Sequence, residues 1–98
     1  MKYKLLSKNE FKRVLSSYPS EQMQLIDLRE PEEYNYWHVS GAVNYSYETI
    51  EEWSKTLNIR YPVLLYCSHG NESIRAARYL GSRGYQVASL IGGVGVRK

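Results

Sequence analysis

The sequence predicts a single α/β domain with a mostly parallel central sheet and helices on both faces. Short apolar runs alternate along the chain with segments whose apolar residues recur at helical spacing, which is the pattern of strand–helix–strand units. The chain has 98 residues, which suits one hydrophobic core rather than two. We therefore expect residues 1–98 to form one domain.

Capping and turn residues separate the expected elements in the first half of the chain. Ser7 and Glu10 have the spacing of a capping box, and Pro19 ends the helix that they begin. Pro31 suits the first position of a second helix. In order, we expect a strand at 3–6, a helix after Ser7, a buried strand at 23–28, a helix at 31–37 and a strand at 42–45.

The second half of the chain continues the alternation. Thr49 and Glu52 have the spacing of a second capping box, and Gly84 suits the C-terminal cap of the last helix. The run 62–66 is apolar throughout, as expected for a central parallel strand covered on both faces. In order, we expect a helix after Thr49, a central strand at 62–66, a helix at 73–83 and a strand at 87–91 before the turn Gly92-Gly93.

Composition and cysteine usage exclude several classes of protein. No apolar run approaches the ~20 residues of a membrane helix, and no signal-peptide core follows the N-terminus, so we expect a cytoplasmic protein without a membrane partner. Cys67 is the one cysteine, so no intrachain disulfide can form. One cysteine and two histidines lack the paired spacing of a zinc site, and we expect no metal and no cofactor. The ten tyrosines are scattered without a basic cluster, which disfavours a nucleic-acid partner.

Charge is distributed unevenly along the chain. Residues 21–52 hold eight Asp/Glu and one Arg, whereas residues 53–98 hold seven Lys/Arg and one Glu. Cys67 falls in the basic part. Two interpretations are open: solvated helix faces, or a field that favours a small anion near the cysteine.

The strongest candidate for a functional site is the polar segment between the central strand and the next helix. In a parallel sheet this segment lies at the carboxyl ends of the strands, where ligands bind. Backbone N–H groups of such a loop can surround a sulfur atom, and the following helix adds the partial positive charge of its N-terminus. Both effects would stabilise a thiolate and an anionic sulfur adduct. The candidate residues are Cys67 and the loop residues Ser68, His69, Gly70, Asn71, Glu72 and Ser73.

Several of these residues also have an ordinary structural interpretation. A lone cysteine after an apolar run, such as Cys67, is often a small buried core residue. His69 is either a general base or anion contact, or a histidine that faces solvent. Ser73 suits a donor to the adduct and equally an N-cap residue. Glu72 either repels an anion or points outward at the start of the helix.

Four segments of the chain occur together in an order typical of one family. They are LIDLREPEEY at 25–34, HVSGAVN at 38–44, the segment 66–73 with Cys67, Gly70 and Ser73, and LIGG at 90–93. With these segments the chain resembles a rhodanese-like domain of the single-domain sulfurtransferase type. The resemblance covers nearly the whole chain and implies a three-layer sandwich with a mostly parallel central sheet.

The resemblance also implies an activity. In this family a cysteine thiolate takes a sulfane sulfur from a donor such as thiosulfate and becomes a persulfide. The outer sulfur then passes to cyanide, to a thiol or to a sulfur-accepting partner protein. By position, Cys67 would be the nucleophile and the backbone of residues 68–73 the persulfide cradle. Glu72 stands where many members of the family carry arginine.

Outside the loop, the resemblance implies structural roles. Asp27 and Arg29 would form a polar pair near the cysteine loop, with direct catalysis as the minor alternative. His38 and Gly41 would be fold markers.

Two alternative functions are open. A phosphatase or arsenate reductase of the related fold needs the pattern Cys-x5-Arg, because a guanidinium at that spacing clamps a tetrahedral oxyanion. Here Ser73 stands at that spacing from Cys67, and Arg75 lies two residues further along. A non-catalytic binding or regulatory module would keep the fold without the chemistry. The presence of Cys67 together with its loop glycine and serine favours the enzyme.

Overall fold

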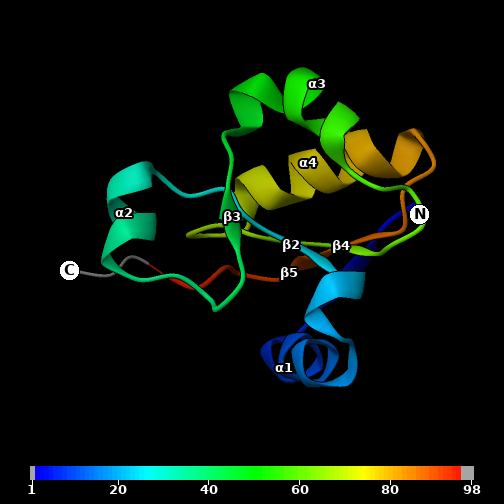
Figure 1. Ribbon diagram of the computed structural model, residues 1–98. Helices are drawn as coiled ribbons and strands as arrows, with labels where there is room; N and C mark the ends of the chain where they lie inside the picture. The colour runs from blue at the N-terminus through cyan, green and yellow to red at the C-terminus, as the bar shows by residue number, and fades with distance from the viewer. Residues whose placement is uncertain (1, 96–98) are drawn as a thin grey trace.

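The central sheet contains five strands, all parallel, in the order β1-β5-β4-β2-β3 (Figure 1). The computed structural model describes residues 2–95, so the two ends of the predicted domain, residues 1 and 98, lie outside the described residues. The prediction of a mostly parallel sheet is confirmed. The strands are β1 (Lys4–Leu6), β2 (Gln24–Asp27), β3 (Val43–Asn44), β4 (Val63–Tyr66) and β5 (Val87–Leu90).

Helices cover both faces of the sheet, which confirms the predicted three-layer arrangement (Figure 1). On one face lies α1 (Lys8–Ser17), and on the other lie α3 (Ile50–Trp53) and α4 (Asn71–Ser82). The short helix α2 (Pro31–Tyr36) lies beyond the carboxyl end of β2. In the described part of the chain there are also three 3-10 helices, at Ser20–Gln22, Tyr47–Thr49 and Ser54–Thr56. Within residues 2–95, no helix has the length and apolar composition needed to cross a membrane.

The central strand β4 divides its side chains between two apolar clusters. Successive side chains of a strand point to opposite faces of the sheet. Leu64 and Tyr66 therefore pack with Phe11 of α1, whereas Leu65 packs on the α4 side. Cys67 continues this alternation and belongs to the cluster on the α4 side. All four residues of β4 are buried, which explains why the run is apolar throughout.

Helix α4 starts two residues earlier than predicted, at Asn71 instead of Ser73. Gly70 is its N-cap and has a φ of 93°, a left-handed conformation that glycine adopts without steric cost. The chain therefore turns into the helix directly after a very short loop. Ser73 lies inside the first turn, so its predicted role as N-cap is wrong and its hydroxyl is available for other contacts.

The two predicted capping boxes have different outcomes. The box formed by Ser7 and Glu10 is confirmed, with both reciprocal hydrogen bonds present at the start of α1. The prediction of a capping box at Thr49 is wrong, because the Thr49 side chain makes no capping hydrogen bond. Instead, the Ser46 hydroxyl accepts the N–H of Glu48 and caps the 3-10 helix that leads into α3.

The segment that follows β5, residues 92–95, packs over the start of the cysteine loop and is called the strap below. The Val94 N–H donates to the carbonyl oxygen of Cys67 at 3.0 Å, and the Gly95 N–H donates to that of Ser68 at 2.8 Å. These bonds satisfy two carbonyl groups that the tight loop would otherwise leave without partners. The last strand thus positions the loop that follows β4.

We expect Gly93→Ala to lower the free energy of unfolding by about 3 kcal/mol or more, because two costs add. Gly93 has a φ of 71°, and a Cβ at this position would overlap the carbonyl oxygen of Ser68. Gly92→Ala is the matched control: its φ is 75° and its Cβ would meet nothing within 4 Å, so only the backbone cost of about 1–2 kcal/mol applies. Chemical denaturation measures both losses. Equal losses in the two variants would contradict the close contact between strap and loop.

Candidate active site

Cys67 follows β4 directly and lies at the carboxyl edge of the sheet, with 2% of its surface exposed. Its sulfur accepts the N–H of Gly70 at 3.0 Å. The hydroxyl oxygen of Ser73 lies 3.5 Å from the same sulfur. A backbone donor and a side-chain hydroxyl therefore both lie within reach of negative charge on Sγ, and both groups can stabilise a thiolate.

A second buried hydroxyl lies behind Ser73. Ser89 on β5 donates to the Ser73 oxygen at 2.7 Å, and Ser73 donates to the carbonyl oxygen of Gly70 at 3.3 Å. Both serines are fully buried. Sequence reasoning missed Ser89, although one signal was present: a hydroxyl residue in the middle of an otherwise apolar strand.

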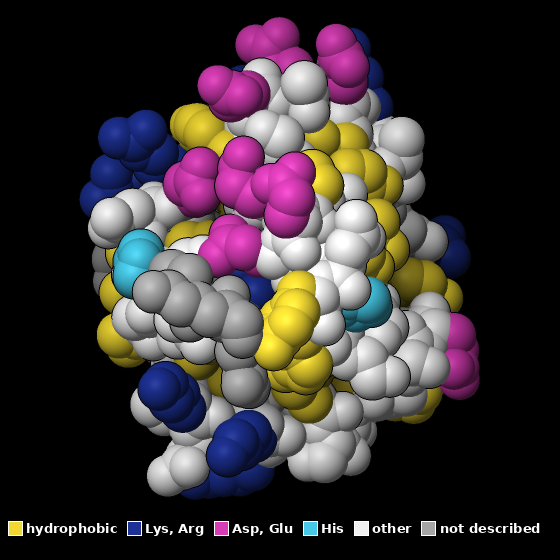
Figure 2. Space-filling view, turned by 90° about the vertical axis from the view of Figure 1, so that its left-hand side faces the viewer, with side chains coloured by type: hydrophobic (Ala, Val, Ile, Leu, Met, Phe, Trp, Pro, Cys, Tyr) yellow, Lys and Arg dark blue, Asp and Glu magenta, His cyan; other side chains and the backbone are white. Residues whose placement is uncertain are grey.

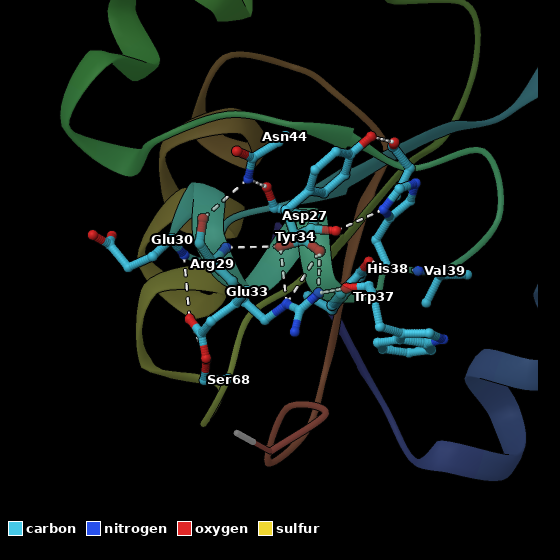
Figure 3. A network of polar contacts seen from close by, with 12 residues as sticks. Asp27, Arg29, Glu30, Glu33, Tyr34, Trp37, His38, Val39, Asn44 and Ser68 are labelled. Carbon is cyan, nitrogen blue, oxygen red and sulfur yellow. Dashed lines mark hydrogen bonds and ion pairs between the residues drawn. The ribbon is translucent and has the colours of Figure 1, made fainter. Parts of the chain in front are cut away.

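The structure does not bring all predicted site residues to the sulfur. His69, Asn71 and Glu72 are exposed, and across residues 2–95 none of their side chains is hydrogen-bonded to it. Ser68 turns its hydroxyl toward α2, where it donates to the carboxylate of Glu33, whose two oxygens lie at 3.4 and 3.2 Å (Figure 3). The Ser68–Glu33 contact joins the cysteine loop to α2, the helix that follows the connection from β2.

A buried ion pair fixes that neighbouring connection (Figure 3). Nη2 of Arg29 lies 2.9 Å from Oδ2 of Asp27, and both side chains are fully buried. The guanidinium also donates to the carbonyl oxygen of Trp37, and Asn44 donates to the main-chain oxygens of Asp27 and Arg29 at 3.0 Å. Burial opposes the charge, but hydrogen bonding to Asp27 and its negative charge raise the pKa of Arg29 on balance. The predicted polar pair is thus confirmed.

Tyr66 ties this network to the strand that carries the cysteine. Its phenol oxygen accepts the N–H of Val39 at 3.0 Å, and the Arg29 guanidinium carbon lies 5.8 Å from its ring centroid. Burial raises the pKa of Tyr66, so the phenol stays protonated at neutral pH. The residue directly before Cys67 is therefore held by contacts on the face of the sheet opposite the sulfur.

Acidic side chains gather on the side of the molecule that carries α2 (Figure 2). Glu30, Glu48 and Glu72 line a depression of about 440 Å³ together with Arg29 and Arg75. The parallel topology explains this mixture, because the β2–α2 connection with Arg29 and Glu30 and the start of α4 with Glu72 and Arg75 meet at one edge of the sheet. The interpretation of a field that favours a small anion gains no support from this arrangement.

The oxyanion clamp of a phosphatase would need a guanidinium where this chain has Ser73. Ser73 is buried and bonded to Ser89, while Arg75 is exposed on α4. Within residues 2–95, a hydroxyl therefore takes the place of the clamp.

Comparisons with known proteins agree with this geometry. A family profile described as "Rhodanese-like domain" matches residues 7–95. "Thiosulfate sulfurtransferase GlpE" of Tolumonas auensis is 40% identical over 70 residues, with 70% of this chain and 66% of that protein covered. The protein of the same name from Pseudomonas fluorescens is 35% identical over 94 residues, with 87% and 83% covered. The crystal structure of a rhodanese-related protein from Thermoplasma volcanium shares the fold, with a TM-score of 0.81, 22% identity, and 94% of this chain and 87% of that chain covered.

Proposed function

The chain belongs to the rhodanese-like domain family, and from this premise we propose that it is a sulfurtransferase whose Cys67 carries a persulfide. It takes a sulfane sulfur from thiosulfate or a similar small anionic donor and passes it to a thiophilic acceptor. The observation that carries the proposal is the Gly70 N–H bonded to a lone cysteine sulfur at the carboxyl edge of a parallel sheet. The relatives from Tolumonas auensis and Pseudomonas fluorescens carry the name thiosulfate sulfurtransferase, which supports the choice of donor.

In the first half-reaction, the Cys67 thiolate attacks the outer sulfur of thiosulfate. A bond forms between Sγ and that sulfur, the S–S bond of thiosulfate breaks, and sulfite leaves with the electron pair. The product is a persulfide whose outer sulfur is negatively charged. The backbone of residues 68–73 and the N-terminus of α4, a helix of 12 residues, stabilise this charge.

In the second half-reaction, cyanide or a thiolate attacks the outer sulfur. The bond between the two sulfurs breaks, and its electron pair returns to Sγ, which becomes a thiolate again. The other product is thiocyanate when cyanide is the acceptor, and a new persulfide when a thiol is the acceptor. Gly70 and Ser73 lie where they stabilise the charge that returns to Sγ.

We also propose the setting in which this chemistry takes place. The natural acceptor is a small thiol or the cysteine of a sulfur-accepting protein. Since Cys67 must be a free thiol at the start of each cycle, a reducing compartment such as the cytoplasm suits the enzyme.

We expect incubation with thiosulfate to add the mass of one sulfur atom to the protein, and Cys67→Ala to gain nothing. Cyanide should then remove the added mass. This step distinguishes a persulfide from a sulfinic acid of similar added mass, because sulfinic acid is not reversed in this way. Intact-protein mass spectrometry measures each state. Sulfur transfer to cyanide by a folded Cys67→Ala protein would contradict the proposal, as would a parent protein without the mass gain.

We expect Glu72→Arg to lower the KM for thiosulfate, with a smaller effect on kcat. Glu72 is exposed at the start of α4, so a positive charge here would attract the dianionic donor before any bond changes. The effect should shrink as salt screens the charge. Glu21→Arg makes the same charge change on the 3-10 helix Ser20–Gln22 and should leave the KM unaltered. Steady-state kinetics at two ionic strengths measure the KM for thiosulfate. An identical KM in the two variants would show that the donor does not pass close to Glu72 on its way to Cys67.

A further inference from the structure

Ser89 occupies a place in the sheet where an apolar side chain would be expected. It lies on β5, between β1 and β4, and pairs with Leu5 and Leu65 in the register of these strands. Its side chain is fully buried. A buried hydroxyl costs free energy unless it is hydrogen-bonded, and within residues 2–95 its partner is Ser73, at 2.7 Å. This contact therefore accounts for a serine at this position of the core.

The contact determines what the Ser73 hydroxyl can do. A hydroxyl has one proton and donates to one acceptor at a time. Because Ser89 donates to the Ser73 oxygen, the Ser73 proton is left for another acceptor. With Cys67 as a thiol, Ser73 donates to the carbonyl oxygen of Gly70 at 3.3 Å and accepts the S–H of Cys67 at 3.5 Å. A charged acceptor attracts a donor more strongly than a neutral one, so the proton turns to the sulfur when Sγ is negative. Donation from Ser89 also strengthens the Ser73 hydroxyl as a donor.

We propose that Ser89 is a positioning residue for sulfur transfer, which holds the Ser73 hydroxyl as a donor to Sγ of Cys67. This inference rests on the proposed function. Ser89 touches no substrate and acts through Ser73 alone. When the acceptor bonds to the outer sulfur, the S–S bond breaks and the electron pair remains on Sγ. Ser73 then stabilises the new charge with a hydrogen bond, and no proton is transferred.

The effect falls mainly on the second half-reaction. Stabilising negative charge on a sulfur makes it a better leaving group and a poorer nucleophile. Loss of the Ser89 hydroxyl should therefore slow the discharge of the persulfide. On the loading step the same loss has two effects that oppose one another: a smaller fraction of Cys67 is a thiolate, but each thiolate is a stronger nucleophile. A variant that merely folded less well would slow both half-reactions in proportion to the active protein that it contains.

The test measures loading and discharge separately in the parent protein, Ser89→Ala, Ser73→Ala and the double variant. Protein loaded with thiosulfate is mixed with cyanide, and thiocyanate is followed through a single turnover. We expect Ser89→Ala to discharge about two- to tenfold more slowly than the parent. The double variant should discharge no more slowly than Ser73→Ala, because Ser89 has no route to the sulfur except through Ser73. Ser89→Ala removes one oxygen atom, and Ser73 keeps its bond to Gly70, so the variant is expected to fold.

Ser54→Ala is the matched control. Ser54 is also a buried serine, and its hydroxyl donates to the carbonyl oxygen of Glu51 at 3.4 Å, near the end of α3. This variant should discharge at the rate of the parent. An unchanged discharge rate in Ser89→Ala would overturn the inference, and so would independent losses that multiply in the double variant. A parent protein that takes up no sulfur from thiosulfate would overturn the proposed function, and this inference with it.

Discussion

The hydrogen bond from the Gly70 N–H to Sγ of Cys67 is the interaction on which the site depends. It requires a loop so short that the amide three residues after the cysteine returns to its sulfur. Such a loop requires Gly70 in the left-handed conformation and a backbone that the strap holds in place. A Cβ on Gly70 would lie 3.0 Å from the backbone nitrogen of Gly92, so loop and strap approach each other too closely for a larger residue.

The rest of the sheet supports this loop from three sides. The strap extends from β5 and bonds to the main chain of Cys67 and Ser68. Ser89, on the same strand, bonds to Ser73 in the first turn of α4. Helix α2 follows the connection that the buried ion pair fixes, and it reaches the loop through the contact between Glu33 and Ser68. The site is therefore assembled by three parallel strands whose carboxyl ends meet at one edge.

Local sequence patterns predicted most of the fold but only part of the site. The alternation of apolar runs and amphipathic helices is local, so the strands, the parallel sheet and the helix on each face were all predicted. The start of α4 was not, and for Ser73 the sequence left two roles open, of which the N-cap is wrong. The surroundings of Gly70 and Ser73 depend on the strap and on Ser89, which are distant in sequence and belong to β5 and the segment after it. The acidic edge was also missed, since charge counted along the chain does not say which connections meet in space. A buried Ser89 in an apolar strand was the one local sign of the hydroxyl chain.

The Gly70 amide holds the sulfur of Cys67 at the edge of the sheet. Amide NMR spectra of the ¹⁵N-labelled protein test this contact directly, before and after loading with thiosulfate and again after discharge with cyanide. We expect the Gly70 amide signal to move on loading and to return on discharge, because its hydrogen-bond acceptor changes its charge. The Gly84 amide, bonded to Gly81 near the far end of α4, should stay in place. A Gly70 signal that keeps its position while the protein gains and loses sulfur would contradict the account.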